Sequence, residues 1–431
     1  MIINFSVQNF GAIKDKVTLS FEADSSEELE DYYIIEPKKG LRLLKLGLIY
    51  GANASGKTTI LKALDFLRKL VLNPLEKKTQ ELDFTPFLFQ EKIGNTFFEL
   101  EFFHQEKKYL YEIELNKKAI VKEKLYFYNP NKALVFERST DEKKQFTSIK
   151  FGSKIKISKE YKTVLEANTL WNNTVFGGFS KTNFESLELQ SVLDWFTSIL
   201  SPIVSPDVNF IPYILESLEK GIIDKKAIIQ NITKADFKII DFIEETRRTP
   251  LSFKKLMILG QSNDPMREEN LEDDIQATET KRLLFFKHKI DGKEYLINYF
   301  DESLGTQRFY GFSGLLAIMM KYKIIFPIDE IESSLHSDLL RHFLLTFLVN
   351  TKNAQLIATT HHRELLMEKD ILRNDAIWFT EKKENGSTDL YSLADFDSSV
   401  IRNTSSVYNA YKIGKLGALP NLDDYYIDTE N

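Results

Sequence analysis

The chain is 431 residues long, which exceeds the size of one ordinary hydrophobic core, so we expect two or three domains or lobes. Hydrophobic residues make up 43% and charged residues 28% of the sequence, the proportions of a soluble globular protein. The absence of cysteine excludes a disulfide scaffold and thiol catalysis, and it fits a reducing compartment. The formal net charge of −6 argues against an overall field that attracts DNA, although a local basic groove stays open.

The N-terminal residues 1–7 lack the basic segment of a signal peptide and start directly with a strand-like alternation. No run of about 18 apolar residues, the length that spans a membrane, occurs in the sequence. We therefore expect a cytoplasmic protein that does not enter a membrane.

The first forty residues predict a hairpin and a loop. Residues 1–22 alternate between apolar and polar side chains around Asn9-Phe10-Gly11-Ala12, a pattern that predicts a β-hairpin. Residues 24–40 are acidic and irregular, and we expect a surface loop there.

The stretch 46–66 carries the most specific motif of the chain. An apolar run from Leu46 to Tyr50 predicts a buried strand, and helical periodicity from Thr59 predicts a helix that ends near Leu72. Between them the sequence matches G-x-x-x-x-G-K-[ST], the phosphate-binding P-loop. Its glycines let backbone N–H groups point at phosphate oxygens, at the positive end of the following helix.

This loop predicts ATP as ligand and Mg²⁺ as cofactor. We expect Lys57 to reach the β- and γ-phosphates and the Thr58 hydroxyl to be a Mg²⁺ ligand. The residues that we expect to contact the nucleotide here are Gly51, Asn53, Ala54, Ser55, Gly56, Lys57, Thr58 and Thr59.

The middle of the chain changes from strand to helix patterns. From 84 to 151, aromatic-rich runs separated by Asn, Gly and Lys turns predict an antiparallel meander. Helical periodicity follows over 187–200 and 211–223, and 231–242 predicts a short helix leading into a strand. Residues 262–281 are polar and acidic, which is typical of a loop or linker.

The C-terminal part returns to an α/β pattern. Strand patterns occur at 283–289 and 294–300, and helix and strand then alternate to about Leu393. We therefore expect three parts. They are an N-terminal lobe 1–156, an inserted and mainly helical subdomain 157–281, and a C-terminal lobe 282–431.

Two adjacent carboxylates end the buried strand predicted from Ile324. In P-loop enzymes an Asp at such a strand end holds Mg²⁺, and we assign this role to Asp329. Glu330 follows directly and would polarise the attacking water as general base. A solvated turn is the alternative, and the P-loop earlier in the chain favours the metal site.

A further apolar strand, from Ala354, ends in polar residues that include His361 and His362. An imidazole here could sense the γ-phosphate, and we assign this role to His361 rather than to His362. The alternative is a structural histidine at a strand end.

Small and hydroxyl residues precede the helix that leads to the Asp-Glu strand. They predict a second phosphate cradle at a helix N-terminus, and an ordinary helix cap is the alternative. The residues concerned are Ser303, Gly305, Thr306 and Gln307.

The order P-loop, Ser/Gly cradle, Asp-Glu and His resembles that of ABC-type ATPase heads, and Asn9-Phe10 resembles the opening strands of RecF- and SMC-type heads. More specific motifs resemble the AAA-type ATP-binding proteins of prokaryotic antiphage systems (AriA, RloA and AbiL-like proteins), which are related to the OLD ATPases. These motifs are Gly51–Thr58, Glu302–Arg308, Asp329–His336, Thr359–His361, Leu372–Phe379 and Gly414–Asn421. The likeness spans nearly the whole chain and is weakest across 157–281.

The resemblance implies an α/β fold, a P-loop ATPase head with an antiparallel β-subdomain and an inserted helical subdomain. It also implies that Lys57, Glu330 and His361 are catalytic, that Ser303 to Gln307 replace the ABC signature, and that Ser333 to His336 form the D-loop. Two heads would then enclose two nucleotides, as a head-to-head homodimer or part of a larger homo-oligomer. The motif Ser-Leu-Gly-Thr-Gln departs from the usual signature, and Gln90 is a provisional choice for the Q-loop.

The resemblance further implies the sensor or scaffold subunit of an antiphage system. Its partners would be a separate effector, such as a Toprim-type or other nuclease, and a phage-encoded trigger, with 157–281 as the effector-binding surface. One alternative is an OLD-like nuclease, although the stretch from His361 to the end of the sequence is shorter than the roughly 100 residues that we expect for a two-metal Toprim domain. Another is a RecF- or SMC-like repair ATPase, which would need a basic DNA-binding face; direct DNA binding stays open.

Overall fold

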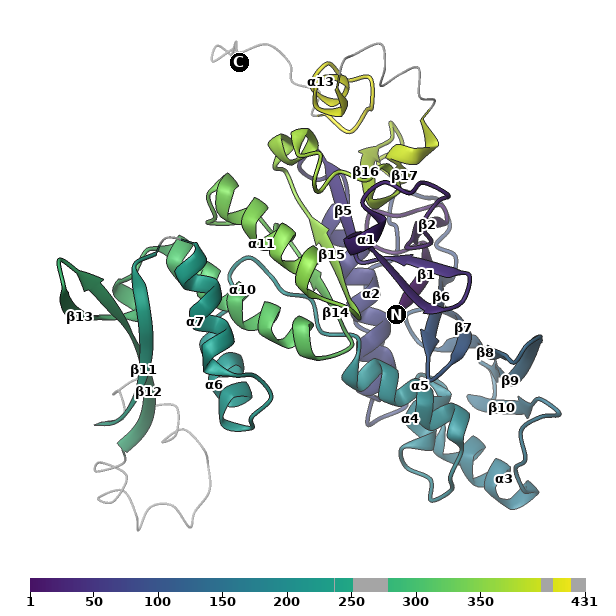
Figure 1. Cartoon of the computed structure of the whole chain (residues 1–431). Helices are drawn as coiled ribbons and strands as arrows, with labels where there is room; N and C mark the ends of the chain where they lie inside the picture. The colour runs from purple at the N-terminus through teal and green to yellow at the C-terminus, as the bar shows by residue number, and fades with distance from the viewer. Residues whose placement is uncertain (236, 251–277, 397–405, 420–431) are drawn as a thin grey trace, which may run out of the picture. The chain divides into compact units, whose positions relative to one another are not determined.

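The computed structural model describes residues 1–235, 237–250, 278–396 and 406–419 (Figure 1). Their contacts form two compact units. The first comprises Met1–Val208, Ile318–Ser333 and Leu340–Asn431, and the second comprises Asn209–Ala317 and Ser334–Leu339. The division at 209 and 317 differs from the expected insertion at 157–281, because the helices between 159 and 198 belong to the first unit.

The first unit contains a seven-stranded antiparallel sheet of order β10-β9-β8-β7-β6-β1-β2. It confirms both the N-terminal hairpin and the meander, which share one sheet because β1 pairs with β2 on one side and with β6 on the other. The strands are β1 Ile2–Gln8, β2 Val17–Ser20, β6 Thr96–His104, β7 Lys107–Leu115, β8 Ile120–Tyr128, β9 Lys132–Asp141 and β10 Phe146–Phe151.

The P-loop helix α2 (Lys57–Leu72) packs on this sheet through aromatic rings. Phe66 of α2 lies 5.6 Å from Phe98 of β6 and 5.2 Å from Phe84, measured between ring centroids. Phe10, directly after β1, contacts all three rings at 5.5 to 6.0 Å. Such offset and edge-to-face pairs add to the burial of apolar area, so the helix that starts at the P-loop is fixed against a rigid sheet.

Residues 24–40 are not entirely the irregular loop that we expected. They include the short helix α1 (Glu30–Tyr33) and the strand β3 (Ile34–Lys38), which pairs with β4 (Leu41–Leu44). The reason is burial, since Tyr33 is fully buried and Ile35 packs in a core cluster. The acidic composition concealed these apolar anchors.

The second sheet of this unit has the order β14-β15-β5-β16-β17. Its first four strands are parallel, and β17 pairs antiparallel with β16. The strands are β5 Leu46–Gly51, β14 Ile324–Ile328, β15 Ala354–Thr359, β16 Ile377–Lys382 and β17 Thr388–Ser392. Strands β5, β14 and β15 are buried along their whole length. Their carboxyl ends therefore share one edge of the sheet, where ligands bind in α/β folds.

Helices and 3-10 turns complete the first unit. The helices that lie wholly in it are α3 Lys159–Asn168, α4 Val175–Phe179, α5 Leu187–Ser198 and α13 Val407–Lys412, and the 3-10 turns are η3 Arg363–Met367, η4 Asn374–Ala376 and η5 Leu393–Asp395. Helix α5 covers the large sheet, because Trp195 lies 4.3 Å from Phe102 between ring centroids. Helix α11 (Ser337–Asn350) lies mostly in this unit.

The second unit is built on the antiparallel sheet β11-β12-β13. Its strands are β11 Ile239–Pro250, β12 Thr278–Ile290 and β13 Lys293–Asn298, and its helices are α6 Ile211–Glu219, α7 Lys225–Lys234, η2 Tyr299–Asp301 and most of α10 Leu304–Lys321. The rings of Phe286, Tyr299 and Tyr310 form its aromatic core, at 5.3 to 5.9 Å. Of the predicted linker 262–281, residues 262–277 lie outside the described residues, and 278–281 belong to β12.

Candidate nucleotide-binding site

The loop between β5 and α2 has the backbone that its glycines predict. Ala54 has a φ of 60° and Gly56 a φ of 104°, both in the left-handed region. A Cβ atom on Gly56 would lie 2.1 Å from Thr388 Oγ1, and one on Gly51 would lie 2.6 Å from the Thr380 carbonyl oxygen. Only glycine allows this close approach, so both glycines of the motif are required by packing.

Two threonines from the neighbouring strands hold the loop from the sheet side. Thr380 Oγ1 lies 2.6 Å from Ser55 Oγ, and Thr388 Oγ1 donates to the Ser55 carbonyl oxygen at 2.8 Å. Both strand threonines are buried. The sequence analysis missed them, because a threonine in a strand carries no local signal of contact with a loop some 330 residues away.

Lys57 is the first residue of α2, and its side chain lies against the backbone of the P-loop. Its side chain is 5% exposed, and Nζ donates to the carbonyl oxygens of Gly51 at 3.1 Å and Ala52 at 2.9 Å. Burial lowers the pKa of Lys57, and the charges of Glu332, Asp329 and Glu330 oppose this shift. The ammonium group is thus surrounded by acceptors, which phosphate oxygens could replace.

The hydroxyl and carboxylate predicted to hold Mg²⁺ are in contact. Thr58 Oγ1 donates to Asp329 Oδ1 at 2.9 Å, and Thr359 Oγ1 donates to the same oxygen at 2.6 Å. One carboxylate and one hydroxyl beside a phosphate cradle fit the preference of Mg²⁺ for oxygen ligands shared with substrate phosphates. The described residues contain no cluster of three or more His, Cys, Asp or Glu side chains that could hold a metal ion.

Glu330 and His361 reach the same hollow as the P-loop. Glu330 has a φ of 46°, and its main-chain N donates to Thr359 Oγ1 at 2.8 Å, which fixes the turn after β14. The hollow has a volume of about 370 Å³. It is lined by Ala12, Asn53, Ala54, Gly56, Lys57, Thr58, Thr59, Glu330 and His361. Three separate motifs of the sequence therefore line one cavity.

The two adjacent histidines lie in different surroundings. Burial and then the charge of Lys57 lower the pKa of His361, which favours a neutral imidazole at the cavity. His362 Nε2 lies 3.5 Å from Glu364 Oε2, and His362 lines none of the cavities described here. Of the two, His361 is the histidine that lines the P-loop cavity.

A second and larger cavity, of about 730 Å³, adjoins the first. It shares Asn53 and His361 with the smaller one and is also lined by Gly51 and Ser55. Its other walls come from 363–383 and 411–419, including Arg363 and Tyr411. All the P-loop positions assigned from the sequence therefore line one of the two cavities.

The predicted signature residues belong to the second compact unit, whereas the P-loop belongs to the first. Ser303 Oγ accepts a hydrogen bond from the Thr306 main-chain N at 3.1 Å, and Gln307 Nε2 donates to the Glu302 carbonyl oxygen at 2.9 Å. A Cβ atom on Gly305 would lie 2.9 Å from the Ser334 carbonyl oxygen. The motif is thus a helix cap in this structure, and its glycine is needed for close packing.

Gln90, the provisional Q-loop residue, forms a hydrogen bond to the turn of the N-terminal hairpin. Its Nε2 donates to Asn9 Oδ1 at 2.9 Å and to the Phe87 carbonyl oxygen at 2.7 Å. It lines neither cavity beside the P-loop.

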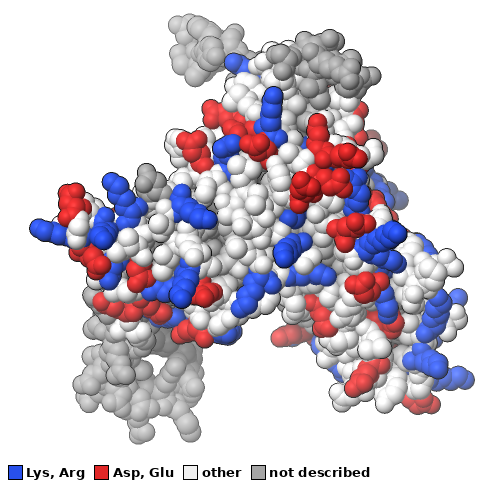
Figure 2. Space-filling model, viewed as in Figure 1, with Lys and Arg blue, Asp and Glu red and all other residues white. Residues whose placement is uncertain are grey.

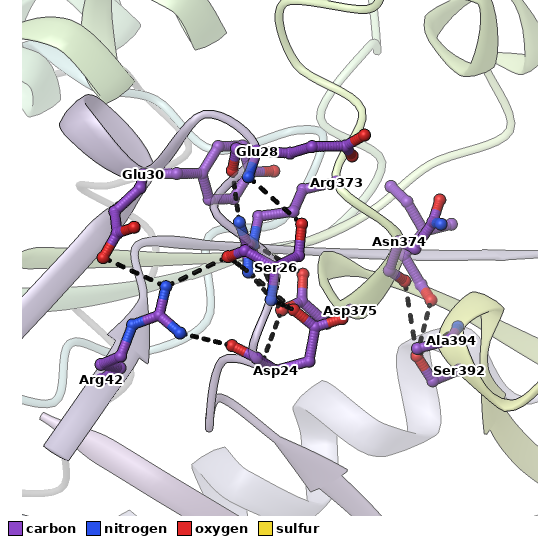
Figure 3. A network of polar contacts seen from close by, with 12 residues as sticks. Asp24, Ser26, Glu28, Glu30, Arg42, Arg373, Asn374, Asp375, Ser392 and Ala394 are labelled. Carbon is purple, nitrogen blue, oxygen red and sulfur yellow. Dashed lines mark hydrogen bonds and ion pairs between the residues drawn. The ribbon is translucent and has the colours of Figure 1, made fainter. Parts of the chain in front are cut away.

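The motif Leu372–Phe379 acts as an anchor for the N-terminal region (Figure 3). Arg373 is 1% exposed, and its Nη2 donates to Asp24 Oδ1, the Ser26 carbonyl oxygen and Asp375 Oδ2 at 2.9 to 3.0 Å. Its Nη1 donates to the Glu28 carbonyl oxygen. This network fixes the segment before β3 to the turn before β16.

Comparisons with known proteins agree with this geometry. Residues 48–368 match the family described as "AAA domain, putative AbiEii toxin, Type IV TA system". The comparison with curated proteins finds no match.

Three solved SMC heads resemble the chain. An SMC head bound to the C-winged helix domain of ScpA has 11% sequence identity and a TM-score of 0.44, and the match covers 91% of this chain and 97% of that chain. The SMC head domain from Thermotoga maritima has 14% identity and a TM-score of 0.39, with 91% of this chain and 98% of that chain covered. An SMC head with an extended coiled coil, bound to the C-terminal domain of ScpA derived from Pyrococcus furiosus, has 13% identity and a TM-score of 0.37, with 96% of this chain and 98% of that chain covered. TM-scores this low carry no functional argument.

The α/β fold predicted from the sequence is confirmed, with a P-loop between a buried parallel strand and a helix, and with a separate antiparallel sheet. Among the described residues no helix is long and apolar enough to cross a membrane. Since the match spans residues 48–368, well over half of the chain, the protein belongs to the AAA-domain family with the description "AAA domain, putative AbiEii toxin, Type IV TA system".

Proposed function

We propose that the protein binds and hydrolyses Mg²⁺-ATP as the sensor or scaffold subunit of an antiphage defence system and controls a separate effector. The observation that carries the ATPase part is the 2.9 Å contact between Thr58 Oγ1 and Asp329 Oδ1 beside Lys57 and Glu330. This contact joins the P-loop to the Asp-Glu motif after β14, and both motifs bind Mg²⁺-nucleotide in P-loop enzymes.

Each residue of the cavity would have one task. The P-loop amides and Lys57 would bind the β- and γ-phosphates. Thr58 and Asp329 would hold Mg²⁺, which would neutralise charge on the phosphates. Glu330 would orient and deprotonate the attacking water, and the neutral His361 would donate a hydrogen bond to the γ-phosphate.

The catalytic unit would be a head-to-head homodimer or a larger homo-oligomer. Ser303, Gly305, Thr306 and Gln307 belong to a different compact unit from the P-loop. This separation is consistent with a site in which the signature of one subunit covers the nucleotide of another.

The defence role is supported by the family. Its description names a toxin of a type IV TA system, which agrees with the resemblance to AriA, RloA and AbiL-like proteins of abortive infection. Figure 2 shows basic and acidic side chains interspersed on the face in view, and the net charge is −6. Neither the mixed charges of this face nor the net charge favours DNA binding.

The experiment is an activity test on the purified protein. We expect the wild type to release phosphate from ATP with Mg²⁺ and to leave plasmid DNA, tRNA and total RNA intact with Mg²⁺ or Mn²⁺. Glu330→Gln serves as the matched control, since it removes the general base and keeps the shape of the side chain. Degradation of nucleic acid by the wild type and not by Glu330→Gln would contradict the proposal and support an OLD-like nuclease.

A further inference from the structure

Glu332 links the segment after β14 to the segment after β15. The sequence analysis assigned no role to this carboxylate. Glu332 lies in the turn after β14, two residues beyond Glu330. Its Oε1 accepts a hydrogen bond from the main-chain N of His361 at 2.6 Å. Its Oε2 is shielded from solvent and has no hydrogen-bond partner among the described residues.

The surrounding contacts make this hydrogen bond decisive for the position of His361. Thr360 is held by its main-chain N, which donates to the Ile49 carbonyl oxygen of β5 at 3.0 Å. The main-chain N of His361 then donates to Glu332, and that of His362 donates to Thr360 Oγ1 at 3.0 Å. The imidazole lines the P-loop cavity, so an error in this main-chain position would move it away from the γ-phosphate site.

The charge of Glu332 also acts on the imidazole of the cavity. Burial and Lys57 lower the pKa of His361, and among the acidic groups that oppose this shift Glu332 has the largest effect. A negative charge at this place opposes the binding of the negatively charged triphosphate.

We infer that Glu332 is a positioning residue of the ATPase site, which sets His361 through its hydrogen bond and weakens ATP binding through its charge. The inference rests on the proposed ATPase function. A purely structural turn residue would alter the melting temperature and leave both kinetic parameters of the folded protein unchanged.

Three substitutions separate the two effects. Glu332→Gln keeps an acceptor for His361 N and removes the charge, so kcat stays within about threefold and the KM for ATP falls about three- to tenfold. Glu332→Asp keeps the charge but is too short to reach His361 N, so kcat falls about tenfold at nearly unchanged KM. Glu332→Leu removes both, so kcat and KM fall together.

The measurements are steady-state ATP hydrolysis, titration of ATP affinity, and melting temperature for each variant. Glu384→Gln, an exposed carboxylate of the same unit, is the matched control and should behave as the wild type. Equal kcat and KM in the wild type, the Gln variant and the Asp variant would overturn the inference.

The outcome for the proposed function is separate. If the wild-type protein does not hydrolyse ATP, the proposed function is contradicted. The inference about Glu332 can still be tested, because ATP affinity is measured without turnover. In that case an unchanged ATP affinity of Glu332→Gln overturns the inference, and a tighter affinity supports its electrostatic part.

Discussion

Thr58 and Asp329 are 271 residues apart in sequence, and their side chains meet at 2.9 Å. Thr58 lies in the first turn of α2 after β5, and Asp329 follows β14. Strand β15 lies between β5 and β14 and contributes Thr359, which donates to the same Asp329 oxygen. The buried parallel strands of this sheet therefore bring the two predicted Mg²⁺ ligands together.

His361→Ala should slow ATP turnover by about 10²-fold or more, the scale of a positioned polar group in a catalytic site. The affinity for ADP, which lacks the γ-phosphate, should stay nearly unchanged. His362→Ala is the control, because His362 lines neither cavity. A comparable loss in the His362 variant alone would show that the wrong histidine was chosen.

Ser303→Arg should abolish hydrolysis and retain nucleotide binding, because it places bulk and charge where the signature of one subunit would meet the γ-phosphate of another. A mixture with Lys57→Ala should regain activity, since one composite site then combines two intact halves. Native mass spectrometry would verify the mixing. Mixed oligomers without activity would contradict a shared site.

Arg373→Met should destabilise the protein by roughly 3–5 kcal/mol, the cost of leaving a buried charge unpaired. Arg373 is 1% exposed, and Asp375, its partner, is also buried. The control is Arg341→Met, whose ion pairs with Glu368 and Asp370 lie at the surface and should contribute about 1 kcal/mol or less. Urea unfolding of both variants measures the difference, and equal losses would contradict the anchoring role of Arg373.

Glu123 should make stability depend on pH. It is fully buried between Tyr111 Oη, which donates at 2.9 Å, and the main-chain N of Val175 at the start of α4, and Arg138 lies 3.8 Å away. Burial raises the pKa of Glu123 from 4.5 to about 7, against the opposing effect of Arg138. The folded state thus holds a proton between about pH 4.5 and 7 that the unfolded state has released, so this group lowers stability as the pH rises through that range.

Glu123→Gln has no charge to bury, so it should gain stability relative to the wild type as the pH rises from about 4.5 to above 7. Thermal unfolding across this range measures the difference in melting temperature. A constant difference would mean that the Glu123 pKa is close to its ordinary value in the folded protein.

The sequence predicted the parts of the site that follow from local patterns. The glycine spacing, the buried strand before it and the helix after it identify a P-loop wherever they occur, and the Asp329-Glu330 pair follows a strand that is apolar throughout. The aromatic alternation of the meander was likewise sufficient to predict an antiparallel sheet.

The rest depends on contacts between distant segments. Glu332 acts through a hydrogen bond to His361, and Thr380 supports Ser55 from another strand. Neither residue type at its position indicates such a partner. The unit boundary at 209 was also hidden, because the helical periodicity of 187–200 and 211–223 is the same on both sides of it.

The most direct test of the account compares Lys57→Ala with Glu330→Gln in ATP binding and single-turnover hydrolysis with Mg²⁺. Lys57→Ala removes the cation that we expect to bind phosphate and should weaken ATP binding, while Glu330→Gln should bind ATP as tightly as the wild type and hold it without hydrolysis. Equal loss of ATP binding in both variants, or wild-type turnover in Glu330→Gln, would contradict the assignment of the site.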